Sequence, residues 1–272
     1  MQQTPDGTLW AWGSNGDGAL GDGTLANRLA PTRVGTETNW ETVEAGGQYA
    51  DPDWGWGDTL TGGSHTAAIK TDGTLWTWGW NIWGALGDGT TTNRLTPVQV
   101  GTGSAWASVV ADWNGAAAIK TDGTLWAWGA ANSPWNDGSI DTNRLTPKRV
   151  GTDTNWASLS AGWSHTAAIK TDGTLWAWGF NSYGELGDGT TVSRLTPVRV
   201  GTASTWASVS AGSGHTAAIT TDGTLWAWGS NWYGELGDGT TTHRSTPGQV
   251  GNGTRWVSAS AGGEYYTIAL QR

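Results

Sequence analysis

The sequence predicts an all-β fold, a β-propeller built from five four-stranded blades. Three observations support this prediction: an internal repeat, short strand-like segments inside each repeat, and the lack of any segment with helical periodicity. The string DGTLW occurs five times in the 272 residues, and the last four copies are spaced by 50 residues. Repeats of about 20–50 residues are typical of solenoids and propellers. The repeat therefore indicates the fold class before any single residue is considered.

Each repeat is predicted to contain four short strands. The first is rich in small residues, which suits a crowded innermost position, and the second alternates along its length. The third places two tryptophans, such as Trp176 and Trp178, on one face, because residues two apart in a strand share a face. The fourth carries a proline, which suits an edge strand that lacks one backbone donor. Examples of the four segments are 206–212, 165–170, 174–179 and 196–200.

The connections between these strands repeat as well. Asp-Gly stands between the second and third strands, and it predicts a type I′ hairpin turn. A long glycine-rich loop, such as 180–194, joins the third strand to the fourth. Four antiparallel strands in each repeat form one blade, and blades arranged around an axis form a propeller.

All 272 residues are predicted to form a single propeller domain. The first predicted strand, 8–13, is a third strand, and the last, 265–270, is a second strand. We therefore expect one blade to be closed by pairing of the N- and C-terminal strands. The predicted blades are 40–100 with an insert at 51–64, 106–150, 156–200, 206–250, and 256–270 completed by 6–35.

The composition excludes several classes of function. The absence of cysteine excludes disulfides, cysteine-ligated zinc and a thiol nucleophile. A net charge of −9 argues against nucleic-acid binding through phosphate neutralisation, and no apolar run approaches the roughly 18 residues of a membrane span. The sequence has no phosphate-binding loop, nucleophile elbow or zinc-protease motif. We therefore expect no enzyme, cofactor, bound metal, membrane insertion or nucleic-acid partner.

The repeat also resembles that of a known family. The pattern AGxxHTAAI…TDGTLWAWGxNxxGELGDGT, at 161–190 and 211–240, is similar to the regulator of chromosome condensation repeat, and the resemblance extends over all five units. It implies a β-propeller, commonly of seven blades. Members differ in function: some exchange nucleotide on a small GTPase and bind chromatin, one plant group senses UV-B, and one bacterial group inhibits β-lactamases. Five copies leave two alternatives, a closed ring or an arc that closes by pairing with another subunit.

The 23 tryptophans divide into two sets. Fifteen recur in phase with the repeat, and we expect them to fill the core between blades, because buried aromatic side chains remove about 150–250 Å² each from water. The others are off the repeat pattern. The turn between the first two strands and the loop between the last two are predicted to emerge on the same face, so off-pattern aromatics gather there. Exposed aromatic clusters usually mark binding surfaces, although such rings also pack loops. The candidate binding residues are Trp54, Trp56, Trp80, Trp83, Trp113, Trp163, Phe180, Tyr183, Trp232 and Tyr233, with Trp135 on a similar loop.

Several polar groups also recur. His65, His165 and His215 occupy one repeat position, with Gly115 and Tyr265 in the other two blades. Symmetry would place them on separate blades, so we expect a structural hydrogen bond within each blade and no shared metal. Four aspartates each precede the repeating arginine by six residues, and we expect these pairs to tie the long loop down. They are Asp22, Asp88, Asp188 and Asp238.

An acidic segment interrupts the first complete repeat. From Glu37 to Asp58 it contains six acidic residues and no basic one. Calcium could bind such oxygen ligands, but the spacing of an EF-hand is missing. We expect a solvated acidic loop, and cation binding stays open as the alternative.

These observations together predict a non-enzymatic binding or structural module. Its aromatic-rich loop face would contact a protein or glycan partner, and self-association is a further option. The alternative is a multivalent sugar-binding lectin, in which repetition supplies avidity. A UV-B sensor is the third interpretation, but Gly162-Trp163-Ser164-His165-Thr166 has Ser164 where the plant motif has arginine. The composition favours an extracellular, cell-surface or virion location.

Overall fold

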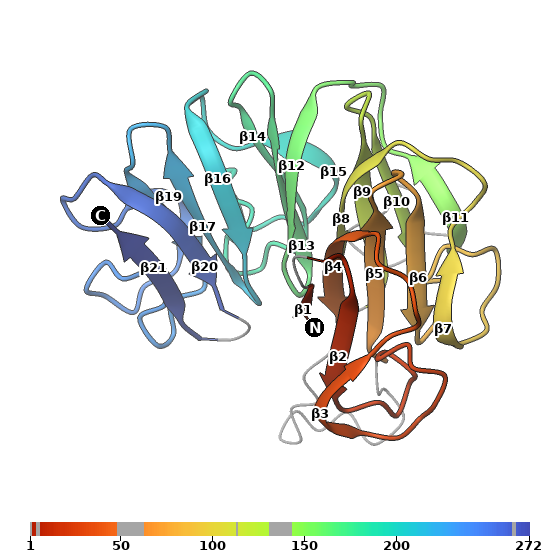
Figure 1. Ribbon diagram of the computed structural model, residues 1–272. Coiled ribbons are helices and arrows are strands. Elements are labelled where there is room, and N and C mark those ends of the chain that lie inside the picture. The colour runs from red at the N-terminus through yellow and green to blue at the C-terminus, as the bar shows by residue number, and fades with distance from the viewer. Residues whose placement is uncertain (1, 4–5, 48–62, 113, 131–142, 263–264) are drawn as a thin grey trace. The chain divides into compact units, whose positions relative to one another are not determined.

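A computed structural model of the protein describes residues 2–3, 6–47, 63–112, 114–130, 143–262 and 265–272 (Figure 1). Within these ranges every regular element is a β-strand, from β1 (Gln2–Gln3) to β21 (Thr267–Gln271). The all-β prediction is confirmed. The chain divides into two compact units, the first containing β1 to β11 and the second β12 to β21. The prediction of one domain over all 272 residues stays a prediction.

Four sheets have the predicted four antiparallel strands in sequence order. The first unit holds two of them: β4 (Trp40–Gly46), β5 (His65–Lys70), β6 (Leu75–Gly79) and β7 (Arg94–Gln99), and then β8 (Trp106–Ala111), β9 (Gly115–Lys120), β10 (Leu125–Gly129) and β11 (Arg144–Arg149). The second unit holds the other two: β12 (Trp156–Ala161), β13 (His165–Lys170), β14 (Leu175–Gly179) and β15 (Arg194–Arg199), and then β16 (Trp206–Ala211), β17 (His215–Thr220), β18 (Leu225–Gly229) and β19 (Arg244–Gln249).

Two further sheets have fewer strands. One has the order β1-β2-β3, with β2 at Leu9–Gly13 and β3 at Arg28–Arg33, and the other pairs β20 (Trp256–Ala261) with β21. Gln2 and Gln3 of β1 pair with Trp10 and Leu9 of β2. The short β1 therefore covers part of the strand edge at which we expected the C-terminal strand. Pairing of the two ends of the chain stays a prediction.

The hairpin between the second and third strands is confirmed, but its turn differs from the predicted type I′. In β13–β14 the amide of Gly173 donates to the carbonyl of Lys170 at 2.9 Å, and Gly173 has a φ of +75°. Asp172 is not among the residues with positive φ, whereas a type I′ turn requires two of them. The connection is a turn closed by one left-handed glycine, because only glycine adopts that conformation without a steric cost.

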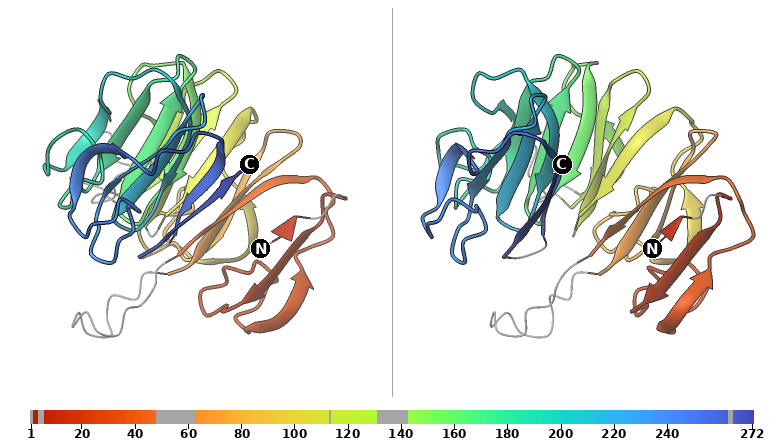
Figure 2. Two further views of the ribbon diagram at one scale, coloured as in Figure 1. Left: turned by 90° about the vertical axis from the view of Figure 1, so that its left-hand side faces the viewer. Right: turned by 60° about the vertical axis from the view of Figure 1, so that its left-hand side comes forward.

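Tryptophans form the core between adjacent sheets, as the repeat predicts. In the second unit, β16 packs against β13 and β20 against β17 (Figure 2). Trp206 and Trp228 lie in one cluster with apolar residues of β13 and β14, and their rings meet edge to face at 6.0 Å. Trp178 is fully buried, but Trp176 is only partly buried, with the Lys170 ammonium 3.9 Å above its ring. The two third-strand tryptophans therefore differ, and only the second belongs to the buried core. Trp12 is an exception, because it is 41% exposed although we expected every in-phase tryptophan to fill the core.

Candidate interaction surface

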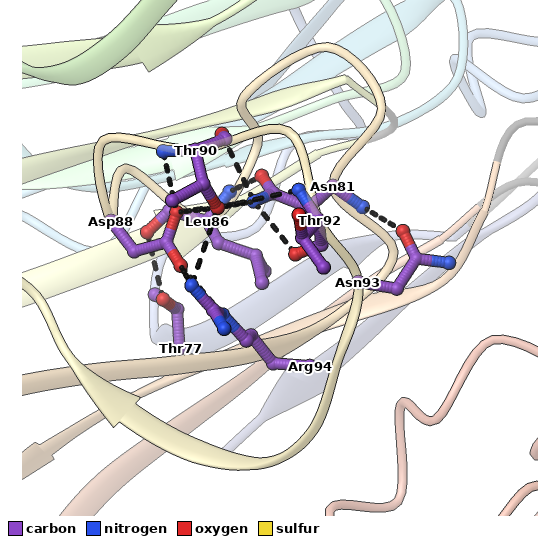
Figure 3. Close-up of polar contacts among 8 residues, drawn as sticks. All are labelled: Thr77, Asn81, Leu86, Asp88, Thr90, Thr92, Asn93 and Arg94. Carbon is purple, nitrogen blue, oxygen red and sulfur yellow. Dashed lines mark hydrogen bonds and ion pairs between the residues drawn. The ribbon is translucent and has the colours of Figure 1, made fainter.

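The four long loops that the structure describes between third and fourth strands are held by one buried asparagine each. In loop 80–93 (Figure 3), the Asn81 side-chain carbonyl accepts the amide of Leu86 at 2.9 Å, and its NH₂ group donates to the carbonyls of Thr90 and Thr92 at 3.1 Å. The same NH₂ group donates to Asp88 at 3.2 Å. Asn81 is completely buried. One side chain therefore satisfies backbone groups across the whole loop.

The predicted aspartate–arginine pairs are confirmed. Asp88 lies 2.7 Å from the guanidinium of Arg94, and Asp188 lies 2.8 Å from that of Arg194. Burial alone would raise the pKa of Asp88, but hydrogen bonds from Thr90 and Arg94 hold it below its usual range. The remaining pairs are Asp22 with Arg28, and Asp238 with Arg244. These pairs hold four of the long loops in place without involving the side chains at their tips.

The turn and the long loop lie at the same end of each sheet, as predicted. In β12–β15 the amide of Phe180, at the start of the long loop, donates to the carbonyl of Ser164, in the turn, at 2.8 Å. Six of the candidate aromatic residues are between 36% and 71% exposed, in agreement with the prediction that these loop aromatics face solvent. They are Trp83, Trp163, Phe180, Tyr183, Trp232 and Tyr233.

Trp80 does not belong to this surface. It is only 5% exposed, although we expected it among the exposed loop aromatics. Its ring lies against Gly63, where even a methyl group would collide with it, and its amide donates to the carbonyl of Ser64. The lack of a side chain at Gly63 gives the ring room to fold back. The other candidates, Trp54, Trp56, Trp113 and Trp135, lie outside the described residues, as do residues 48–62 of the acidic segment.

Three rings of the second unit form what we call the aromatic cluster: the exposed Tyr183 and Trp232, and the partly buried His243. The Trp232 ring lies 4.6 Å from His243 and 6.3 Å from Tyr183, and Tyr183 lies 5.2 Å from His243. The cluster joins loop 180–193 of one sheet to loop 230–243 of the next. Beside it, Tyr233 contacts Tyr265 at 4.6 Å.

His243 is a member that the sequence analysis missed. Its Nδ1 accepts the amide of Asn231 at 2.9 Å. In loop 80–93 the side chain of Asn93 accepts the corresponding amide of Asn81. The signal was a histidine at a repeat position that holds asparagine in three other copies and serine in the fourth. Such a change keeps the acceptor and adds a ring to the surface.

A buried glutamate supports each aromatic tip of the second unit. The carboxylate of Glu185 accepts the amide of Tyr183 at 2.7 Å, and that of Glu235 accepts the amide of Tyr233 at 2.7 Å. Both glutamates are at most 3% exposed. Burial raises the pKa of Glu185, because the charged form loses its hydration. The backbone that holds these rings is therefore fixed from below.

The repeated histidines make structural contacts, but between neighbouring sheets and not within a blade. His165 Nε2 lies 2.8 Å from the hydroxyl of Thr216, and His215 Nε2 lies 3.0 Å from that of Thr267. Desolvation lowers the pKa of His165 to about 3, with a smaller contribution from His215. Tyr266, and not Tyr265, takes the corresponding place in the last sheet, because the carbonyl of Tyr266 accepts the amide of Gly262 as that of His215 accepts Gly212. Among the described residues, no three side chains of metal-ligand type gather.

Comparison with known proteins places this geometry in a family. The RCC1-like domain matches residues 56–272, and the regulator of chromosome condensation (RCC1) repeat matches residues 6–50. The chain belongs to the RCC1-like family. In the described parts of this RCC1-like chain, no helix is long and apolar enough to cross a membrane.

Solved structures show the same fold. Human WBSCR16 gives a TM-score of 0.83 at 20% identity, covering 99% of this chain and 69% of its own. Prp20p from Saccharomyces cerevisiae gives 0.78 at 23% identity, covering 100% of this chain and 66% of its own. The RCC1-like chain is thus a β-propeller protein with roughly five blades of repeated four-stranded sheets.

A curated relative matches a shorter region. The ultraviolet-B receptor UVR8 of Arabidopsis thaliana is 35% identical over 109 residues, which are 40% of this chain and 22% of the receptor. The RCC1-like chain therefore spans only part of the length of the relatives it matches. Two of the solved structures concern protein partners: yeast RCC1 (Prp20) bound by Kap60, and Prp20p with its binding properties to Gsp1p and histones.

Proposed function

We propose that this RCC1-like chain is a non-catalytic protein-binding module whose contact surface is the aromatic cluster. One observation carries the proposal: Tyr183, Trp232 and His243 contact one another while Tyr183 and Trp232 stay 36% and 59% exposed. Tryptophan and tyrosine are enriched among the few residues that supply most of the binding energy of an interface.

The support beneath the rings favours the same function. The buried side chain of Asn181 forms hydrogen bonds with the backbone of Leu186 and Val192. The carboxylate of Glu185 accepts the amide of Tyr183, so the backbone around this ring is held in place. A surface that is already ordered loses less conformational entropy on binding, so more of the contact energy appears as affinity. Solvent-exposed rings on a braced loop therefore suit recognition better than loop packing alone.

The charges favour a protein over nucleic acid as partner. The net charge is −9, and four arginines of the loops are already paired with aspartates. The protein partners of Prp20 support this choice at the level of the family. UV-B sensing has less support, because Ser164 stands in place of the motif's arginine and Trp163 is half exposed to solvent.

A binding comparison tests the proposal. The immobilised wild-type chain, the double variant Tyr183→Ala/Trp232→Ala, and the control Leu29→Ala would be exposed to extracts of the source cells. Leu29 is a fully exposed apolar residue on β3, outside the long loops. Candidate partners would then be purified, and their Kd measured by calorimetry.

We expect a purified protein to bind the wild type and the control alike, and to bind the double variant at least about tenfold more weakly, the size of effect seen for contact residues that dominate an interface. A partner that binds the double variant with unchanged Kd would refute the surface assignment. Binding on a glycan array that free sugar abolishes would replace the protein partner with a carbohydrate.

A further inference from the structure

The second tryptophan of three third strands, those of Trp78, Trp128 and Trp228, enters a site on the preceding sheet, which we call the indole socket. Trp228 donates its indole N–H to the carbonyl of Glu185 at 2.9 Å, and its ring lies against Gly187, where a side chain would collide with it. In the first unit Trp78 and Trp128 donate to the carbonyls of Ala19 and Ala85 at 2.8 and 2.9 Å. Each socket thus offers one backbone carbonyl and one glycine to an indole.

The socket over Glu235, at the C-terminal end of the chain, is open. Its carbonyl accepts the hydroxyl of Thr267 at 2.8 Å, as the Glu185 carbonyl accepts that of Thr216 at 2.9 Å. At Gly237, the counterpart of Gly187, a methyl group would meet only Val250 within 4 Å. A cavity of about 380 Å³ lies here. A cavity of about 150 Å³ is enough for benzene, so this one has room for an indole.

The walls of the open socket match those of the filled one. Around Trp228 they include Leu175, Ala177, Leu186 and Val200. Around the cavity, 50 residues further along the chain, they are Leu225, Ala227, Leu236 and Val250. The residue types are identical at all four positions. The open site therefore has the shape and polarity that hold a tryptophan of this repeat elsewhere in the same chain.

One third-strand tryptophan is exposed instead of buried. Trp12 is 41% exposed, whereas its four counterparts are at most 1% exposed. Strand pairing of β1 with β2 covers Leu9 and Trp10 and stops short of Trp12. The counterparts are Trp78, Trp128, Trp178 and Trp228. The chain thus carries one open socket and one exposed indole of the type that fills such sockets.

The two terminal sheets are also complementary, because each has the strands of a blade that the other lacks. The sheet of β20 and β21 has a first and a second strand, whereas β2 and β3 are a third and a fourth. Strand register aligns Ile268 and Leu270 with Ala217 and Ile219. The latter two are buried, but Ile268 and Leu270 are 65% and 57% exposed. An apolar strand face at one end of the chain therefore has no cover among the described residues.

We propose that the socket over Glu235 receives Trp12 of a second copy of this chain, so that copies associate head to tail. Strands β2 and β3 of one copy complete the sheet of β20 and β21 of the other, and the Trp12 indole donates to the Glu235 carbonyl. Such a contact joins two different surfaces and is heterologous. The proposal is independent of the aromatic cluster, because neither Trp12 nor Ile268 belongs to it.

Two variants at exposed positions test the contact from both sides. Trp12→Ala removes the indole, and Ile268→Glu places a charge on the receiving strand face. Trp83→Ala, at an equally exposed tryptophan in another loop, is the matched control. Sedimentation velocity over a hundredfold range of concentration would measure association, and thermal unfolding would confirm that each variant is folded.

We expect the wild type and Trp83→Ala to associate as concentration rises, and each end variant alone to stay monomeric. An equimolar mixture of the two end variants should form dimers, because Trp12→Ala retains its receiving end and Ile268→Glu retains its indole. The mixture should stop at dimers, since each pair has one intact contact. A wild type that stays monomeric at every concentration overturns the proposal. If Trp12→Ala then also lowers the melting temperature, the socket is filled by the same chain.

Discussion

Loops 80–93 and 180–193 share a framework and differ at their tips. Asn81 and Asn181 accept the amides of Leu86 and Leu186 at 2.9 Å in both cases. The tips have diverged: at the position of Ala85 in the first loop, the second has Glu185, which holds the backbone of Tyr183. An inward-facing asparagine thus fixes the loop, so the outward-facing residues can change without loss of the fold.

The two loops differ underneath as well. Thr216 joins His165 to loop 180–193, because its hydroxyl lies 2.8 Å from His165 Nε2 and donates to the carbonyl of Glu185 at 2.9 Å. At the corresponding position in the next sheet of the first unit stands Ala116, which has no hydroxyl. Loop 180–193 is therefore held by a hydroxyl from the next sheet, whereas loop 80–93 is held by one from its own third strand, because Thr77 donates to the carbonyl of Leu86 at 2.7 Å.

Removing the indole beneath loop 180–193 should have the largest effect. Trp228→Ala deletes a fully buried ring and its hydrogen bond to Glu185, and we expect a loss of about 3–5 kcal/mol in the free energy of unfolding. Trp232→Ala, at an exposed tip position, should cost under about 1 kcal/mol. Urea unfolding of both variants measures the difference. Equal losses would contradict the division between framework and tip.

Removing the hydrogen bonds of the Asn181 side chain should have the second-largest effect on stability. Asn181→Leu leaves the amide of Leu186 and the carbonyls of Thr190 and Val192 without their partner. Each buried polar group without a partner costs about 1–3 kcal/mol, so we expect a loss of roughly 2–4 kcal/mol where water reaches part of the loop. Ser182→Ala, at the next and exposed position, is the control and should change stability by under about 0.5 kcal/mol.

Acid should weaken both regions through their buried histidines. Desolvation lowers the pKa of His165 to about 3 and that of His65 to about 4, so the folded chain keeps both neutral where the unfolded chain takes up protons. Stability is therefore fully present above pH 6.5 and falls as the pH drops below it, by about 1.4 kcal/mol per unit for each histidine. Unfolding in urea between pH 7 and 5.5 measures this slope. His165→Gln should reduce the slope, and an unchanged slope would contradict the assignment.

The smallest effect is expected at the tip itself. Glu185→Ala gives loop 180–193 the residue that loop 80–93 has, and we expect a net change within about 1 kcal/mol, since one hydrogen bond is lost and one buried carboxylate removed. Burial raises the pKa of Glu185, so its contribution to stability is present at low pH and lost as the pH rises. Between pH 4.5 and 7, the stability of the variant should rise relative to that of the wild type in the same urea assay. A fall in the relative stability of the variant as the pH rises would show that the hydrogen bond to Tyr183 outweighs the cost of burying the carboxylate.

The repeat made most of the fold predictable. Strand order, the hairpins and the aspartate–arginine pairs follow from spacing alone, because four sheets reproduce one pattern. The burial of Trp80 could not be predicted, since it depends on Gly63 in a segment outside the repeat pattern. Nor could the contact of His243 with Trp232, because it arises between two loops of different repeats. A repeated sequence pattern predicts the contacts that recur in every copy. The contacts of the candidate surface occur in single copies, so the pattern does not predict them.

The indole sockets of different repeats resemble one another closely, and this likeness affects how the chain folds. Trp128 is 43 residues from the carbonyl that it binds, and the socket one repeat further away would require a chain segment roughly twice as long. A doubling of loop length costs only about 0.6 kcal/mol in closure entropy. Chain connectivity alone therefore barely favours the correct neighbour. Discrimination against misassembled blades must come from differences such as Thr216 against Ala116, and sequence divergence between repeats would then act as protection against misfolding.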